Sequence, residues 1–322
     1  MDKMVRKSSR RRFLAGAVAG LASLAGAGMA QSPASGRRVS ITIDDGPVVG
    51  AGEDLAFFQR VTAGLIECFR AERVPVVLFV NERQLNVQGQ RDARAETLTQ
   101  WLDAGFEIGN HTYSHINLNE RPLSEYKEDV IKGEVITRSL LESRGQRLRW
   151  FRHPYLRTGH TPEIARELQA FLDQRGYTVA PVTVDYADYS FAPVYSRFLR
   201  AGDNASANRV LGAYLDQVDA GFAEAEKLSK AVLGYELPQT LLIHCNELNS
   251  VSLRDSIARM RKQGYSFVTL EEALKDPAYQ RSDRYTGTRG RTWLKRWAMD
   301  EGIDLPPELT MPQWIQDLPR QG

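Results

Sequence analysis

The sequence lacks several features that identify large classes of protein. Its 322 residues contain only two cysteines, so the fold cannot depend on a disulfide framework. A net charge of +2 gives no electrostatic reason to expect a nucleic-acid partner. The absence of a Gly-x-Ser-x-Gly elbow disfavours a serine hydrolase of that type, and the absence of a phosphate-binding glycine loop disfavours a nucleotide enzyme. With 42% hydrophobic and 25% charged residues, the composition is that of an ordinary globular protein.

The first thirty residues have the pattern of an export signal rather than of a folded element. A basic start is followed by an apolar run rich in Ala and Gly, and small residues end at Ala30. Within this segment, residues 9–14 read Ser-Arg-Arg-Arg-Phe-Leu and resemble the twin-arginine signal. We therefore expect residues 1–30 to be a signal peptide and Gln31 to begin the mature protein. A general secretory signal or an uncleaved anchor is the alternative interpretation.

Export would place the protein in the periplasm or outside the cell, where two cysteines are able to pair. Cys68 lies within a predicted helix and Cys245 directly follows a predicted strand, with no diagnostic spacing. We therefore predict two buried free thiols. No segment after residue 30 is apolar enough to cross a membrane, so we expect no stable membrane insertion once the signal is removed.

Strand-like and helical patterns alternate along the rest of the chain. The predicted strands are 39–43, 75–80, 106–110, 148–151, 177–184, 240–243 and 265–268. The predicted helices are 53–72, 92–104, 123–144, 162–175, 207–233 and 253–263, with a cap at Thr161 and a capping box from Ser252 to Asp255. Such alternation predicts a parallel sheet, and seven strands are enough to curl it into a distorted (β/α) barrel. We expect one domain over residues 38–275 and a C-terminal appendix over 276–322.

Polar residues follow five of these seven strands. They are Asp44 and Asp45 after the first, His111 and His115 after the third, Arg152–Tyr155 after the fourth, Asp185–Tyr189 after the fifth and His244 after the sixth. Each alone has an ordinary explanation, such as a turn, a strand-end ion pair or a core histidine. Because catalytic groups of parallel barrels lie at the carboxyl ends of the strands, their equivalent positions favour a functional site.

These residues also form motifs that resemble a known family. The segments Thr-Ile-Asp-Asp-Gly-Pro, His-Thr-Tyr-Ser-His, Arg-His-Pro-Tyr, Asp-Tyr-Ala-Asp and Leu-Ile-His resemble the five ordered motifs of the polysaccharide deacetylases, the family-four carbohydrate esterases. The resemblance covers about residues 38–275. It implies a distorted seven-stranded barrel, a divalent metal and hydrolysis of N- or O-acetyl groups on sugars.

The expected metal site consists of three residues. His111 and His115, four residues apart, are able to point imidazole nitrogens at one cation, and Asp45 would add a third ligand. Three ligands leave an open site of the catalytic kind, and the charge of the cation would offset the repulsion between Asp45 and Asp44. We expect one divalent metal, with Zn²⁺ favoured and Ni²⁺, Co²⁺ or Mn²⁺ as alternatives.

The resemblance implies roles for the other motif residues. Asp44 is the general base that takes a proton from the attacking water, and Arg152 keeps it ionised and aimed. The backbone N–H of Tyr155 stabilises the developing oxyanion together with the metal. His244 is the general acid that protonates the departing amine.

Three more positions complete the expected site. Asp185 would raise the pKa of His244 and orient it, with Asp188 as the alternative partner. Leu242 would line the pocket for the acetyl methyl group. Tyr189 stands where the family pattern usually has tryptophan, so the substrate-side wall differs.

Other departures and two regions carry no implied role. Ile43 replaces the usual phenylalanine before the aspartates, and Leu156 stands where a glycine often follows the third motif. Residues 191–238 form an insertion-like helical stretch placed where it is able to shape the substrate cleft. In the appendix, we interpret the basic stretch over 281–297 as a solvated face whose tryptophans dock on the barrel. Contact with an anionic envelope polymer is the alternative.

The predicted function is that of an exported, metal-dependent hydrolase that removes N-acetyl groups from a peptidoglycan- or chitin-like glycan. Acetyl-xylan esterase and hydrolysis of a small non-sugar amide are alternatives within the same chemistry. A catalytically silent glycan-binding protein is an alternative of another class. Silent relatives typically lose a ligand or the base, whereas both are present in this sequence.

Overall fold

The computed structural model describes residues 36–50, 52 and 54–318. The predicted signal peptide, residues 1–30, lies outside these described residues. From Gly36 onward the chain forms one compact unit, which includes the appendix. Within the described part, no helix combines the length and the hydropathy needed to cross a lipid bilayer.

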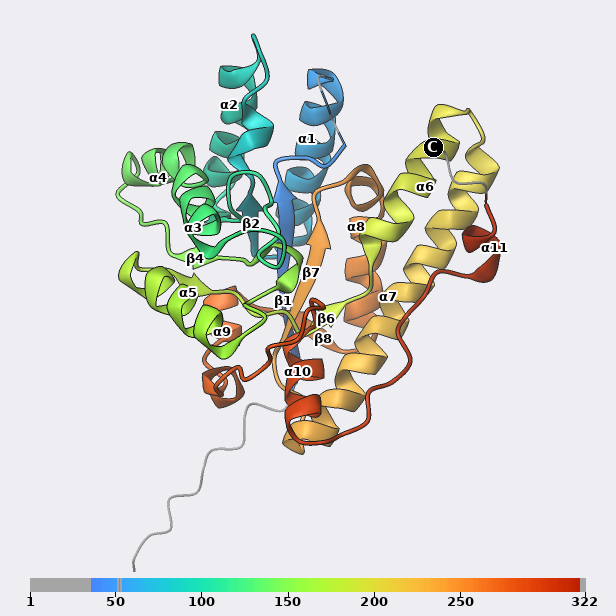
Figure 1. Cartoon of the computed structure of the whole chain (residues 1–322). Coiled ribbons are helices and arrows are strands. Elements are labelled where there is room, and N and C mark those ends of the chain that lie inside the picture. Colours follow the sequence, from blue (N-terminus) through green and yellow to red (C-terminus); the bar gives the residue numbers. More distant parts are fainter. Residues whose placement is uncertain (1–35, 51, 53, 319–322) are drawn as a thin grey trace, which may run out of the picture. The chain divides into compact units, whose positions relative to one another are not determined.

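A curled parallel sheet lies at the centre of this unit (Figure 1). Its strands are β1 (Arg37–Gly46), β2 (Val76–Val80), β3 (Glu107–Asn110), β4 (Trp150–Phe151), β5 (Thr178–Val179), β6 (Val184–Asp185), β7 (Gln239–His244) and β8 (Tyr265–Phe267). Their order is β5-β4-β3-β2-β1-β7-β6, with β8 paired to the beginning of β1, and all the pairings are parallel. The predicted α/β fold with a curled parallel sheet is confirmed.

The described sheet has eight strands rather than seven because the predicted strand 177–184 is split. Its first part, β5, pairs with β4 at one edge, and its second part, β6, pairs with β7 at the other edge. Between them, Ala180 N donates to Phe151 O at 2.8 Å and Thr183 N donates to Thr240 O at 2.9 Å. Since an extended chain covers at most about 3.5 Å per residue, this short connection keeps the two edges within roughly 18 Å of each other. The sheet therefore has to curl into a distorted barrel.

Helices surround the sheet (Figure 1). They are α1 (Leu55–Glu72), α2 (Arg91–Asp103), α3 (Leu123–Lys132), α4 (Val135–Glu142), α5 (Pro162–Gln174), α6 (Asp188–Arg200), α7 (Asn204–Leu233), α8 (Glu247–Lys262), α9 (Leu270–Ala273), α10 (Trp293–Asp300) and α11 (Gln313–Gln316). In Figure 1, α3, α4 and α5 lie to the left of the sheet, and α6, α7 and α8 lie to the right. The predicted helix 123–144 is divided at Gly133, which packs so closely on the backbone of Thr112 that no Cβ fits there.

Two predicted helix starts have opposite outcomes. Thr161 caps α5 as predicted, because its side chain accepts a hydrogen bond from Ile164 N. The predicted capping box at Ser252 is wrong. Asn246 caps α8 instead, and Ser252 lies inside the helix, where its hydroxyl donates to Leu248 O at 2.7 Å. An i−4 hydrogen bond of this kind satisfies a serine hydroxyl within a helix.

The insertion and the appendix pack together on one side of the barrel. The insertion forms α6 and α7, which contact each other and α8, and α10 of the appendix packs on α7. Trp293 and Trp297 are buried, with 8% and 3% of their surface exposed, in agreement with the interpretation that they dock on the domain. Four basic side chains of the appendix form ion pairs with carboxylates: Arg281, Arg291, Lys295 and Arg296. Much of the basic charge is therefore neutralised within the protein.

Candidate active site and metal centre

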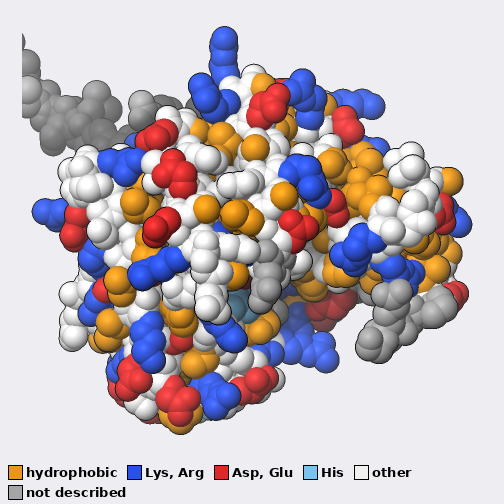
Figure 2. Space-filling model, turned by 90° about the horizontal axis from the view of Figure 1, so that it is seen from above, with side chains coloured by type: hydrophobic (Ala, Val, Ile, Leu, Met, Phe, Trp, Pro, Cys, Tyr) orange, Lys and Arg blue, Asp and Glu red, His pale blue; other side chains and the backbone are white. Residues whose placement is uncertain are grey.

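The side chains predicted to meet lie at the carboxyl end of the sheet. Figure 2 looks onto this end and shows the pale blue of histidine inside a hollow. The contributing residues are Asp44 and Asp45 at the end of β1, His111 and His115 after β3, Arg152 after β4, Asp188 after β6 and His244 at the end of β7. The parallel topology brings these sequence-distant groups to one rim, as expected.

Asp45, His111 and His115 converge on one point. A ligand atom from each residue lies within 4.8 Å of the other two. Asp45 Oδ1 is 3.5 Å from His111 Nε2 and 3.4 Å from His115 Nε2. This oxygen is buried and has no hydrogen-bond donor among the described residues. A buried carboxylate oxygen without a donor, facing two imidazole nitrogens, fits a divalent cation.

The protonation of the two histidines also suits a cation. His111 Nδ1 hydrogen-bonds to the carbonyl oxygen of Arg152 at 2.8 Å, so Nδ1 carries the hydrogen and Nε2 carries the free lone pair. Burial, with the nearby charge of His115, holds the pKa of His111 well below its usual value. Burial also lowers the pKa of His115, although the carboxylate of Asp45 opposes the shift. Both rings are therefore neutral ligands near pH 7.

The turn that carries the histidines is conformationally unusual and well supported. Thr112 and His115 have positive φ angles of 64° and 57°, which residues other than glycine rarely adopt. Thr112 N donates to Asn110 Oδ1 at 2.7 Å, and the amide of Asn81 donates to the carbonyls of His111 and Thr112 at 2.6 and 3.1 Å. These buried amides hold the turn in the shape that aims both imidazoles inward.

Asp44 lies directly beside the triad and is almost fully buried. Its Oδ2 is 3.6 Å from His111 Nε2 and 3.4 Å from the Arg152 guanidinium, and its Oδ1 has no hydrogen-bond partner among the described residues. Burial raises the pKa of Asp44 to about 7, although the charge of Arg152 opposes the shift. A carboxyl group with a pKa near neutrality, next to a cation site, is suited to general base chemistry.

Arg152 contacts both the carboxylate of Asp44 and the candidate metal ligand His111. Its guanidinium, fully buried, contacts Asp44, donates to Thr42 Oγ1 at 2.8 Å and lies 4.8 Å from the centre of the Phe79 ring. Its carbonyl oxygen orients His111. One residue thus fixes the candidate base through its side chain and a candidate ligand through its backbone.

The partner of His244 is Asp188, not Asp185. His244 Nδ1 is 2.7 Å from Asp188 Oδ1, and His244 N donates to Asp188 Oδ2 at 2.8 Å. Burial alone would lower the pKa of His244, but the charge and hydrogen bond of Asp188 raise it to about 10. The imidazole is therefore protonated at neutral pH and able to donate a proton.

Asp185 occupies a different place for a local reason. It ends β6, and its Oδ1 accepts the backbone N–H of Ala187 at 2.8 Å in a tight turn. Ala187 has a positive φ of 58°, and this turn carries the chain on to Asp188, the first residue of α6. The prediction that Asp185 orients His244 is thus wrong in its contact, and the alternative, Asp188, makes it.

Three residues that the sequence did not indicate fix the position of Asp188, two by direct hydrogen bonds and one through a neighbour. The Asn249 side-chain amide donates to Asp188 Oδ2 at 2.5 Å and to the carbonyl of His244 at 2.8 Å. Tyr214 of α7 donates its hydroxyl hydrogen to Asn249 Oδ1 at 2.5 Å, which fixes the orientation of that amide. Asn246 adds a third hydrogen bond to Asp188 Oδ2, at 2.9 Å. The insertion thus supports the candidate acid through Asn249.

The expected substrate-side residues differ in exposure. Tyr155 and Tyr189 are 51% and 54% exposed, and their rings lie 4.3 Å from the His115 ring and 5.6 Å from the His244 ring, respectively. Leu242 is 4% exposed and packs in the core, and it does not line either hollow next to Asp45. The two tyrosines are therefore placed to contact a substrate, whereas Leu242 supports β7 from within.

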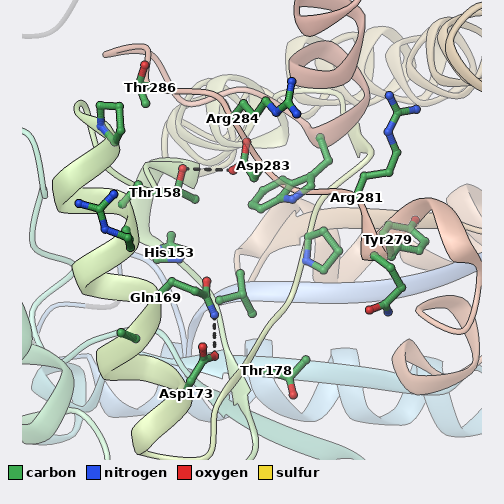
Figure 3. Close-up of a pocket in the computed structure, with 18 of the residues that line it drawn as sticks. His153, Thr158, Gln169, Asp173, Thr178, Tyr279, Arg281, Asp283, Arg284 and Thr286 are labelled. Carbon is green, nitrogen blue, oxygen red and sulfur yellow. Dashed lines mark hydrogen bonds between the residues drawn. The ribbon is translucent and has the colours of Figure 1, made fainter.

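Two hollows meet at Asp45. One, of about 360 Å³, extends past His115 along Asn81 and Tyr113. The other, of about 210 Å³, extends past His244 and Tyr189. A ligand that spans both would pass over Asp45. A larger cavity of about 870 Å³ lies between α5 and the appendix and contains His153 but none of the triad (Figure 3).

The cysteines take no part in this chemistry. Cys68 and Cys245 are both free and buried, as predicted. Cys245, next to His244, donates its thiol hydrogen to Pro47 O at 2.5 Å.

Comparison with known proteins agrees with the geometry. The polysaccharide deacetylase family model matches residues 31–179. A peptidoglycan-N-acetylglucosamine deacetylase of Listeria monocytogenes is 21% identical over 236 residues, which are 73% of this chain and 38% of that protein. One of Bacillus cereus is 26% identical over 158 residues, which are 49% of this chain and 48% of that protein. The chain thus spans less than half the length of these curated relatives.

Solved structures share the fold at low identity. A pseudoenzyme of the CE4 carbohydrate esterase family from Bacillus anthracis has a TM-score of 0.51 and 18% identity, covering 74% of this chain and 66% of that one. A mutant of a CE4 pseudoenzyme with restored activity has a TM-score of 0.50 and 19% identity, covering 74% and 68%. Residues 31–179 of this chain thus match the polysaccharide deacetylase family, in agreement with the motifs and with the shared fold.

Proposed function

We propose that this protein is an exported, metal-dependent hydrolase that removes N-acetyl groups from an acetylated glycan. The observation that supports this most directly is the convergence of Asp45, His111 and His115 beside a buried carboxyl group, Asp44. Across the same rim stands a protonated histidine, His244. Metal-assisted amide hydrolysis requires a cation, a general base and a general acid, and this arrangement supplies the two protein groups and a site for the cation.

The three converging residues would hold the metal. Two neutral imidazoles and one carboxylate are the ligand set of an open catalytic Zn²⁺ site, and Ni²⁺, Co²⁺ or Mn²⁺ accept the same donors. When bound, the cation supplies Lewis-acid polarisation of the acetyl carbonyl and increases the acidity of water.

Asp44 takes a proton from the attacking water. Its Oδ1 is buried and free of hydrogen-bond donors among the described residues, so it is available as an acceptor. Arg152, held by Thr42, keeps the other oxygen in place. A fixed guanidinium also favours the ionised form, which is the form that acts as a base.

His244 delivers a proton to the departing amine nitrogen. Asp188 keeps its imidazole charged and oriented through Nδ1, which leaves Nε2 as the donor. The backbone N–H of Tyr155, in the third motif, is assigned to the developing oxyanion. Tyr155 and Tyr189 offer aromatic surfaces on which sugar rings can stack.

For the substrate, we propose a peptidoglycan- or chitin-like polymer with N-acetylated sugars. The curated relatives are named as peptidoglycan-N-acetylglucosamine deacetylases, and the two hollows that meet at Asp45 suit an extended ligand. Export, through the twin-arginine-like signal at residues 1–30, would bring the enzyme to such a polymer outside the cytoplasm.

Acetate release from a panel of substrates tests this proposal. Peptidoglycan fragments, N-acetylglucosamine oligomers, acetylated xylan and a small N-acetyl amide are compared, each with and without a chelator. We expect release from an N-acetylated glycan that stops with chelator and returns with Zn²⁺. Release from acetylated xylan alone would indicate an O-acetyl esterase instead.

The resemblance of fold to a pseudoenzyme makes one further test necessary. Asp44→Asn keeps the size of the side chain but removes the base, so we expect a fall in acetate release of about 10²–10⁴-fold with metal retained. Unchanged acyl chemistry alongside persistent glycan binding would identify a silent glycan-binding protein.

A further inference from the structure

The loop after β4 is held in an unusual backbone conformation. It runs from Arg152 to Thr158 and carries Tyr155, whose N–H is the proposed oxyanion donor. Tyr155 and the next residue, Leu156, both have positive φ angles, of 56° and 53°. Two consecutive residues of this kind persist only where the surrounding structure holds them in place.

The residue that holds this loop is Arg296 of α10, in the appendix. Arg296 is 2% exposed, and its guanidinium donates to the carbonyl oxygen of Leu156 and, at 2.9 Å, to the hydroxyl of Thr158. It also forms an ion pair with Asp283 and stacks 4.0 Å from the centre of the Trp293 ring. A buried, planar guanidinium with several acceptors fixes its partners far more narrowly than a surface ion pair would.

A second part of the appendix touches the same loop. A Cβ at Gly290 would overlap the carbonyl oxygen of Tyr155, so only glycine allows the two backbones to approach this closely. Thr158 also donates to Asp283 at 3.3 Å, a contact visible in Figure 3 at the rim of the large cavity. The appendix is itself fixed to the barrel, because Trp293 N donates to Val182 O at 2.7 Å.

The contacts of Arg296 and Gly290 fix the peptide groups that follow Tyr155 and Leu156. The hydrogen bond to Leu156 O orients one peptide plane of the turn, and the Gly290 contact orients the plane before it. The N–H of Tyr155 is attached to the same turn, and the Tyr155 ring packs on His115. A movement of this loop would therefore displace the oxyanion donor and disturb a candidate metal ligand.

We propose that the C-terminal appendix completes the active site, with Arg296 as a positioning residue for the loop Arg152–Thr158. This inference rests on the proposed function for its consequence in catalysis. Its structural part, the holding of the loop, stands on the contacts of Arg296 and Gly290 alone. The appendix thus has a role in the site that its position after the last family motif does not suggest.

The test compares Arg296→Met and Arg296→Lys with Arg284→Met in the full chain. Arg284 is an exposed residue of the same segment whose side chain has no hydrogen bond or ion pair among the described residues, so it is a matched control. We expect kcat to fall by about 10²-fold in Arg296→Met with KM and metal content almost unchanged, because a displacement of about 1 Å is enough for such a loss. Lysine should recover part of kcat, and Arg284→Met should match the wild type.

Hydrogen exchange by mass spectrometry provides a readout that does not need activity. In Arg296→Met, exchange should rise in the peptide covering residues 152–158 and stay unchanged in β1, β2 and β7. Wild-type kcat with unchanged exchange in that peptide would overturn the proposal. A rise spread over the whole chain, or an equal loss in Arg284→Met, would overturn it as well, since either would mean general destabilisation.

Two safeguards separate the outcomes. If Arg296→Met does not fold, Gly290→Ala provides a second variant at an exposed position, because its added Cβ would push the Tyr155 carbonyl and so displace the same loop. We expect an approximately tenfold fall in kcat and the same local rise in hydrogen exchange. Wild-type behaviour of a folded Gly290→Ala would then count against the inference. If the wild-type chain releases no acetate from any substrate, the proposed function fails, and the exchange measurement still decides whether Arg296 holds the loop.

Discussion

The two sides of the site are built in different ways. On the metal side, Asp45, His111 and His115 follow β1 and β3, and the main support of His111 is a backbone carbonyl, that of Arg152. The side chains of Asn81 and Asn110, which lie at the ends of β2 and β3, also hold the histidine turn, so the support on this side comes from neighbouring strands. On the acid side, His244 hydrogen-bonds to Asp188, and Asp188 accepts a hydrogen bond from Asn249 of α8. Tyr214 of the insertion in turn donates to Asn249. The support on the acid side depends instead on packing between distant helices. The metal side therefore depends mainly on the sheet, whereas the acid side also depends on the insertion.

The largest expected effect is on the metal side. His111→Ala removes a ligand and should abolish both stoichiometric metal binding and acetate release, because the two remaining donors cannot hold an open site. Metal analysis of the purified protein is the measurement. His160→Ala is the control, since His160 is exposed and lies outside the triad. Full metal occupancy in His111→Ala would show that the triad is not the metal site.

A smaller effect is expected on the acid side. Asp188→Asn removes the negative charge that keeps the pKa of His244 at about 10, so the imidazole should lose its proton at lower pH. The alkaline limb of the pH–kcat profile should then move to lower pH, with a loss of about tenfold or more at pH 8 and with metal retained. Asp185→Asn is the matched comparison, and it should leave this limb in place. A shift with Asp185→Asn alone would restore the original assignment of the partner.

The smallest effect tests how far the insertion reaches into the site. Tyr214→Phe removes one hydrogen bond to Asn249 and should reduce kcat about threefold to tenfold, with a stability loss of about 1 kcal/mol. Tyr195→Phe is a suitable control, because Tyr195 is a buried tyrosine of α6 whose hydroxyl has no hydrogen bond among the described residues. Equal kcat values for the two variants would mean that the insertion supports the fold but not the acid.

The contrast between the two sides also explains what the sequence could predict. Strand ends are local features, so the positions of Asp44, Asp45, His111 and His115 at one rim followed from the alternation of strands and helices. The choice between Asp185 and Asp188 was not local. A turn at Ala187 uses Asp185 for its own backbone and leaves the next carboxylate to face His244.

Other differences have the same origin. The segment 177–184 splits into two strands because its first part pairs with β4 and its second part pairs with β7. A run of strand-forming residues does not indicate which strands it will pair with. The start of α8 at Asn246 rather than Ser252 depends on the network around Asp188, in which Asn246 also takes part. The roles of Tyr214, Asn249 and Arg296 arise from contacts across more than thirty residues of sequence and have no motif.

Leu156 shows how a single side chain can change the mechanics of a loop. Its backbone has the geometry that glycine adopts freely, yet Leu156 is only 6% exposed and its side chain packs in the hydrophobic core. A glycine there would relax the main chain and at the same time release this anchor. The loop Arg152–Thr158 is therefore anchored at its centre, by the core through the Leu156 side chain and by the C-terminal segment through the Leu156 carbonyl.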